Sequence, residues 1–178
     1  MTSLVITIVG PDRPGMVSAL SDKAVAYGAN WADSLMANFA GQFAGIVQLE
    51  VPAKNCDALV AALRMMESPD LRIVITRADA VRTPDATRHL QLELVGHDRP
   101  GIIHGISAQL AQYSVSIDKL KTHIASGAMS GEQMFHMNAQ LTVPIALDTD
   151  ALRAGLESLA NELMVDITFD SGAGLEQL

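Results

Sequence analysis

A short polar motif that occurs twice contains the residues best suited to chemistry. The hexapeptide G-x-D-R-P-G begins at Gly10 and again at Gly96, each time between an apolar run and a segment with helical spacing. At a helix start, free backbone N–H groups and the positive end of the helix dipole favour an anion such as a carboxylate. The aspartate of the motif, Asp12 or Asp98, could hold an ammonium group. The motif therefore offers contacts for both ends of a zwitterionic amino acid.

The same motif also has a purely structural interpretation. An aspartate just before a helix is a common N-cap, Pro-Gly is a common turn element, and Arg13 could simply be solvated. Pro14 suits the first helical turn, where a missing N–H costs little. Gly15 lacks a side chain, so a ligand or another backbone could approach the turn closely. Repetition of the hexapeptide favours a function, although duplication would also copy a structural turn.

Other chemistries fit the residues less well. The G-x-x-x-x-G spacing that starts at Gly10 resembles a phosphate-binding P-loop, but Met16-Val17 and Ile102-Ile103 stand where that loop needs Lys and Ser/Thr. No G-x-S-x-G or dinucleotide fingerprint occurs in the sequence. His123 and His136 could meet across a hairpin, but no Cys/His metal spacing accompanies them. We therefore expect no catalytic residues, no cofactor and no metal site, and hence a protein that is not an enzyme.

The composition narrows the choice of partners. With 12 basic against 20 acidic residues, the formal net charge is −8. Direct binding to nucleic acid is disfavoured, because it relies on Lys and Arg to replace counterions. The single cysteine, Cys56, excludes an intramolecular disulfide, and no apolar run approaches the ~18 residues of a membrane helix. We expect a cytoplasmic protein without membrane contacts, and its 49% hydrophobic content favours a homo-oligomer.

The repeat extends past the motif and predicts the architecture. Residues 4–15 match residues 90–101, and the apolar face of the following helix is preserved at the same offset. Each half then reads as strand, helix, strand, strand, helix, strand. This order predicts two tandem ferredoxin-like α+β domains, each an antiparallel sheet with both helices on one face.

We expect strands at 4–9, 31–39, 43–51, 71–77, 90–95, 115–125, 132–143 and 164–170, and helices at 15–28, 55–67, 101–113 and 148–163. The expected domains are 1–80 and 90–171, with a linker at 81–89 and a flexible tail at 172–178.

The first half of the chain resembles the ACT domain, a small-molecule-binding regulatory module. The resemblance lies in the D-R-P-G loop, the amphipathic helix after it and the Gly28-Ala29-Asn30 that follows the helix. The second half of the chain repeats this pattern. The resemblance implies a ligand at an interface between two domains, held by the strand-to-helix loop and by an Asn just after the first helix. Asp12 and Asn30 match these positions in the first copy. In the second copy Ser116 replaces the Asn, so the first copy is expected to be the better site.

The resemblance implies ligand-binding residues in both copies. They are Asp12, Arg13, Pro14, Gly15, Met16 and Asn30 in the first, and His97, Asp98, Arg99, Gly101, Ile102 and Ser116 in the second. The tandem arrangement is most similar to transcriptional repressors that control glycine breakdown. This implies a regulator that contacts a DNA-bound activator, with a small amino acid, glycine or serine, as ligand. Two other functions stay open: a regulatory subunit of a separate amino-acid or one-carbon metabolic enzyme, and a dimerisation module without a ligand.

Overall fold

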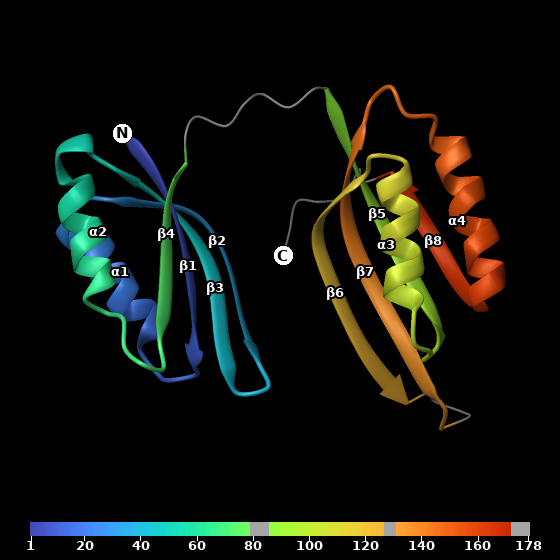
Figure 1. Ribbon diagram of the computed structural model, residues 1–178, viewed down its shortest axis with the longest axis horizontal. Coiled ribbons are helices and arrows are strands. Elements are labelled where there is room, and N and C mark those ends of the chain that lie inside the picture. Colours follow the sequence, from blue (N-terminus) through green and yellow to red (C-terminus); the bar gives the residue numbers. More distant parts are fainter. Residues whose placement is uncertain (79–85, 127–130, 172–178) are drawn as a thin grey trace. The chain divides into compact units, whose positions relative to one another are not determined.

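The computed structural model describes residues 1–78, 86–126 and 131–171, and the chain divides into two compact units, Met1–Arg82 and Thr83–Leu178 (Figure 1). The first unit contains β1 (Thr2–Pro11), α1 (Met16–Ala26), β2 (Asn30–Phe39), β3 (Gln42–Val51), the 3-10 turn η1 (Ala53–Asn55), α2 (Cys56–Arg64) and β4 (Arg72–Ala78). The second unit contains β5 (Thr87–His97), α3 (Ile102–Gln112), β6 (Ser116–Ser126), β7 (Gln133–Pro144), α4 (Thr149–Leu163) and β8 (Val165–Ser171).

Both units have the same sheet topology, which confirms the predicted fold class. The strand order is β2-β3-β1-β4 in the first sheet and β6-β7-β5-β8 in the second. All neighbouring strands named in these sheets run antiparallel. In each unit the two helices cover one face of the sheet and leave the other uncovered (Figure 1). Within the described ranges, no helix is long and apolar enough to cross a membrane.

The period-two pattern of the strands explains why each sheet has one buried face. In β1, Leu4, Ile6 and Ile8 point toward the helices and are at most 1% exposed. Leu59 and Leu63, on the apolar stripe of α2, belong to the same core. Burying one such side chain stabilises the fold by about 1.5–3 kcal/mol, so these stripes hold the helices against the sheet. The second core repeats the arrangement with the leucines of β5 and α4.

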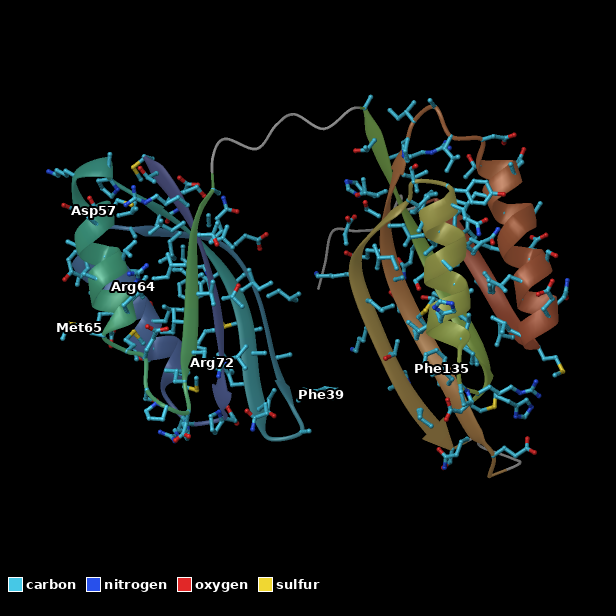
Figure 2. All side chains as sticks on the ribbon, viewed as in Figure 1. Phe39, Asp57, Arg64, Met65, Arg72 and Phe135 are labelled. Carbon is cyan, nitrogen blue, oxygen red and sulfur yellow. The ribbon has the colours of Figure 1, made fainter. Side chains whose placement is uncertain are left out.

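The uncovered face of the first sheet is apolar. Leu35 of β2, Ile46 of β3 and Val74 of β4 are exposed hydrophobic residues of this sheet. Phe39, at the end of β2, is 78% exposed and projects from the β2–β3 hairpin (Figure 2). An exposed apolar surface of this kind is typical of faces that contact another protein.

The second unit begins earlier than the sequence pattern indicates. We expected residues 81–89 to form a linker, but β5 already starts at Thr87, which pairs with Pro144 of β7. The Arg88 guanidinium donates to the carbonyl of Leu147 at 2.8 Å and to Thr149 Oγ1 at 2.6 Å, which ties the strand to the start of α4. The rest of the expected linker, residues 81–85, and the expected tail, residues 172–178, lie outside the described part of the chain.

Candidate binding site at the repeated loop

A glycine with a left-handed backbone connects each motif to its helix. Gly15 is the N-cap of α1 with φ of 90°, and Gly101 is the N-cap of α3 with φ of 96°. A Cβ at either position would meet no atom within 4 Å. Glycine is therefore needed for the backbone conformation, rather than for space around it. Pro14 lies one residue before the N-cap and two before Met16, the first residue of α1, so the expectation that it lies in the first helical turn was wrong.

The first turns of α1 and α3 carry no side-chain cap. Neither helix has a capping hydrogen bond from a side chain or an acidic residue in its first turn. By contrast, α4 is capped by Asp148, whose Oδ1 accepts from the N–H groups of Asp150 and Ala151 at 2.9 and 3.4 Å. The motif aspartates lie three residues before the N-cap, so the interpretation of Asp12 as an N-cap is excluded. The two motif helices thus keep N-terminal N–H groups that can receive an anion.

The first motif aspartate is oriented by the end of β2. Asn38 Nδ2 donates to Asp12 Oδ2 at 2.6 Å, and the Asp12 N–H donates to the Gly41 carbonyl at 3.0 Å. In the second unit the Asp98 N–H donates to the Gln133 carbonyl at 2.9 Å, so the backbone arrangement is the same. Ile124 stands at the register position of Asn38, however, and supplies no amide. The sequence analysis missed Asn38, because only the strand register reveals it.

Asn30 lies at the opposite end of the sheet from Asp12. Asn30 pairs with Glu50, which pairs with Ser3 at the start of β1. Asp12 follows the last residue of β1, nine positions further along, which corresponds to roughly 30 Å of extended chain. One unit therefore does not bring these two residues to the same small molecule. Ser116 and Asp98 are separated in the same way, since Ser116 pairs with Thr142 at the far end of β7.

The segment around Asn30 is well ordered by its own contacts. The Ala29 N–H donates to the Ala24 carbonyl at 2.8 Å, and Asn55 Nδ2 donates to the Tyr27 carbonyl at 2.9 Å. Trp31 packs against the first core, as expected for a packing residue. The Asn30 side chain is exposed and has no hydrogen-bond partner among the described residues.

The remaining candidates differ in what their side chains can reach. Arg13 Nη2 lies 3.5 Å from Asp70 Oδ2 in a pair that is about two-thirds exposed on both sides (64% and 65%). Arg99 contacts the Met164 sulfur at 3.9 Å. His97 Nδ1 lies 3.4 Å from Glu132 Oε2.

Two first-turn residues of the motif helices are partly or wholly internal. The Ile102 side chain is 2% exposed and belongs to the second core, so only its backbone can face a ligand. Met16 is half-buried and packs against the first core.

The first residue of each motif has a structural role that the sequence analysis did not assign. A Cβ on Gly10 would lie 2.8 Å from the Asp70 carbonyl oxygen, and a Cβ on Gly96 would lie 2.5 Å from Val165 Cγ1. Both glycines therefore allow the start of the last strand of the unit to pack beside the motif. Their identical place in the two copies is the only sequence signal for this role.

Similarity to known proteins agrees with this architecture. Residues 2–74 match the family model of the ACT domain. The first unit therefore matches the ACT domain over most of its length, and the second unit repeats its motif, topology and register, so the chain has a tandem ACT-like architecture. The chain is 31% identical to an unknown protein from Galdieria sulphuraria, whose crystal structure superposes with a TM-score of 0.80 over 95% of this chain and 97% of that one.

Among named proteins, the chain is similar to the glycine cleavage system transcriptional repressor of Escherichia coli (strain K12). The two are 24% identical over 161 residues, which cover 90% of this chain and 85% of the repressor. A solved structure assigned to the same kind of repressor shares the fold, with a TM-score of 0.67 and 20% identity over 95% of this chain and 96% of that one.

Proposed function

We propose that the chain is a regulatory protein that binds a small amino acid, with glycine and serine as the first candidates. The observation that carries this proposal is the pairing of an uncapped helix start with an oriented carboxylate, Asp12, in the first unit. The two groups match the two charges of a zwitterion. Similarity to the glycine cleavage repressor over 161 residues supports the same function.

The ligand would lie with its carboxylate at the first turn of α1. There the backbone N–H groups donate to it, because α1 has no acidic residue in its first turn to compete. The ammonium group would bind Asp12 Oδ1, since Asn38 donates to the other oxygen, Oδ2. A small side chain suits this geometry, because Asp12 to Gly15 are all exposed and offer little apolar surface to a larger one.

The amino-acid site at Asp12 needs a second protein surface that supplies Asn30. Asn30 is exposed and unpartnered among the described residues, yet lies far from Asp12 in its own unit. We infer that the Asn30 that reaches a ligand at Asp12 belongs to another copy of the chain, so the protein acts as a homo-oligomer. A ligand held between two copies stabilises the packing arrangement to which it binds more tightly. The ligand can shift the equilibrium between two arrangements only by the difference in its affinity for them.

The two units would differ in affinity. Asp98 lacks the amide partner that Asp12 has, because Ile124 replaces Asn38, and Ser116 replaces Asn30. We therefore place the tighter site in the first unit. Its effect on transcription would pass through contacts with a DNA-bound activator, because a chain of net charge −8 is poorly suited to bind DNA directly.

Isothermal titration calorimetry of the full chain with glycine and serine tests the proposal. The Asp12→Ala variant should lose the tighter site, whereas Asp98→Ala, which removes the same group from the same loop of the second unit, should keep it. An absence of saturable heat with either amino acid, from protein that circular dichroism shows to be folded, contradicts the proposal. Capture of a metabolic enzyme in place of a transcription factor from a lysate of the source cells would contradict the proposed partner.

A further inference from the structure

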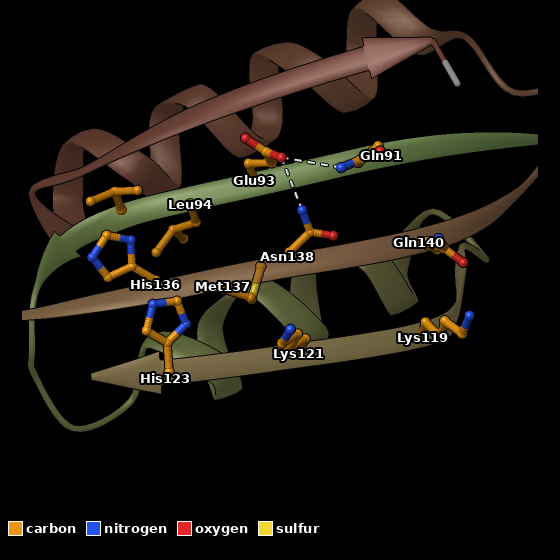
Figure 3. A pocket seen from close by; sticks show the side chains of 11 residues that line it. Gln91, Glu93, Leu94, Lys119, Lys121, His123, His136, Met137, Asn138 and Gln140 are labelled. Carbon is orange, nitrogen blue, oxygen red and sulfur yellow. Dashed lines mark hydrogen bonds between the residues drawn. The ribbon is translucent and has the colours of Figure 1, made fainter. Parts of the chain in front are cut away.

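The face of the second sheet that α3 and α4 leave uncovered is hollowed into a groove along β6, β7 and β5 (Figure 3). Because side chains alternate along a strand, every second residue of β6 points into this groove. Three cross-strand pairs line it: Lys119 with Gln140, Lys121 with Asn138, and His123 with His136. The groove lies on different elements from the repeated loop and is independent of the amino-acid site proposed above.

The two lysines of the groove form no ion pair with the described part of the chain. Lys119 and Lys121 are exposed, and neither has an ion-pair partner among the described residues. The carboxylate that lines the groove, Glu93, is instead held by amides. Its Oε1 accepts from Gln91 Nε2 at 3.1 Å and from Asn138 Nδ2 at 2.9 Å (Figure 3). The groove thus contains two ammonium groups without ion-pair partners and one carboxylate, which is engaged by amides that also line the groove.

Two histidines line the same groove as the lysines. The rings of His123 and His136 are stacked, with centroids 4.7 Å apart and planes 6° from parallel. An imidazole ring always carries at least one N–H group, which can donate a hydrogen bond to an anion. The histidines therefore add donors that favour the same kind of ligand as the lysines.

A comparison with the first sheet shows that the fold does not require lysine and histidine side chains on this face. At the register positions of Lys119, Lys121 and His123, strand β2 has Asp33, Leu35 and Ala37. Opposite them, β3 has Ile46 and Ala44 where β7 has Asn138 and His136. The same surface in the first unit is therefore largely apolar. The cationic groove is a property of the second unit alone, which indicates a binding function rather than a structural one.

We propose that this groove binds the phosphate group of a small molecule or free inorganic phosphate. A phosphate group can bind both lysines at once, because its several oxygens can accept from ammonium, imidazole and amide groups together. Among the described residues no arginine lines the groove, so its cationic donors are the lysine ammonium groups, which bind phosphate as point charges. The exposed Asp166 and Asp170 of β8 pair with Val95 and Gln91 and share this face, which disfavours a long polyanion such as nucleic acid.

Phosphate binding by the full chain tests the inference, measured by calorimetry in a buffer free of other multivalent anions. We expect saturable binding of inorganic phosphate that weakens by about tenfold or more in Lys119→Gln/Lys121→Gln, because charged hydrogen bonds are lost. The matched control is Lys54→Gln/Arg64→Gln, which removes two exposed charges from the first unit and should leave the affinity unchanged. No saturable binding of phosphate or of a phosphate ester overturns the proposal, as does equal weakening in both double variants.

Three further ligands identify the source of the anion. Glycerol 3-phosphate that binds about tenfold more tightly than inorganic phosphate would assign the groove to a phosphorylated small molecule, and equal affinity would assign it to free phosphate. Malate, a dicarboxylate of similar charge, should bind more weakly than either. Tighter binding of malate or of a short single-stranded oligonucleotide would overturn the phosphate assignment. The variant His123→Gln/His136→Gln should weaken phosphate binding severalfold while the thermal unfolding curve stays unchanged.

Discussion

Asn38 Nδ2 donates a hydrogen bond of 2.6 Å to Oδ2 of Asp12, so the last part of β2 orients the carboxylate that follows β1. The two residues are 26 positions apart in the sequence and meet only because the sheet places the ends of β2 and β1 beside the same hairpin. No equivalent contact with β6 holds Asp98, since Ile124 occupies the place of the amide. The two otherwise similar loops therefore differ in how the side chain of their aspartate is held.

The first prediction concerns this amide. Asn38→Leu keeps the approximate shape of the side chain but removes its donor, so Asp12 should lose its orientation. We expect the dissociation constant for glycine to rise about fivefold to tenfold, as for the loss of one typical hydrogen bond. Because Asn38 is exposed, the stability of the fold should change by less than about 0.5 kcal/mol. Ile124→Leu at the matching position of the second unit is the control, and calorimetry is the measurement.

Unchanged glycine affinity in Asn38→Leu, from protein that still binds glycine, would show that the orientation of Asp12 does not matter for the ligand. Loss of binding together with a lowered melting temperature would instead show that the amide is structural. Either result contradicts the role given to Asn38 here.

The fold could be predicted from the sequence because its signals are local. The alternation of Leu4, Ile6 and Ile8 indicates a strand with one buried face, and the repeated hexapeptide indicates the first strand-to-helix loop of each unit. The contact between Asp12 and Asn38 could not be predicted, because it depends on the register of two strands. The separation of Asp12 from Asn30, in contrast, follows from the order strand, helix, strand: the helix returns the chain to the other end of the sheet.

The second prediction uses the backbone of the first motif. Gly15 has φ of 90°, and a Cβ added there would meet no atom within 4 Å. A substitution at Gly15 is therefore destabilising only because other residues disfavour this left-handed backbone conformation. Gly15→Val should lower the free energy of unfolding of the first unit by about 1–2 kcal/mol. Gly15→Asn should cost less, since asparagine tolerates the left-handed region better. Urea unfolding followed by fluorescence of Trp31, the single tryptophan, reports on this unit. Equal losses in both variants would contradict the backbone explanation.

The third prediction compares two arginines of the second unit. Arg88 is half-buried and donates to Leu147 and Thr149, whereas Arg99 is exposed and contacts the Met164 sulfur. Arg88→Ala leaves a carbonyl and a hydroxyl without their donor and should destabilise the unit by about 1–3 kcal/mol. Arg99→Ala should change its stability by less than about 0.5 kcal/mol. Hydrogen exchange of the β5 amides measures both, and equal protection in the two variants would contradict the anchoring role of Arg88.

The fourth prediction tests whether two copies of the chain complete one amino-acid site. If Asp12 of one copy and Asn30 of another hold the same ligand, Asp12→Ala and Asn30→Ala proteins should each fail to bind glycine tightly. A mixture that has been unfolded and refolded together should regain binding, because a mixed dimer contains one site in which both residues are intact. At equal concentrations about a quarter of the wild-type number of sites should return.

Refolding each variant alone is the control for this experiment, and sedimentation establishes that oligomers form. A mixture that stays inactive although mixed oligomers are present would mean that no site combines Asp12 and Asn30 from separate copies. The ligand would then depend on the loop of a single unit. The exposed Asn30, separated from Asp12 by the length of the sheet, would have no part in binding it.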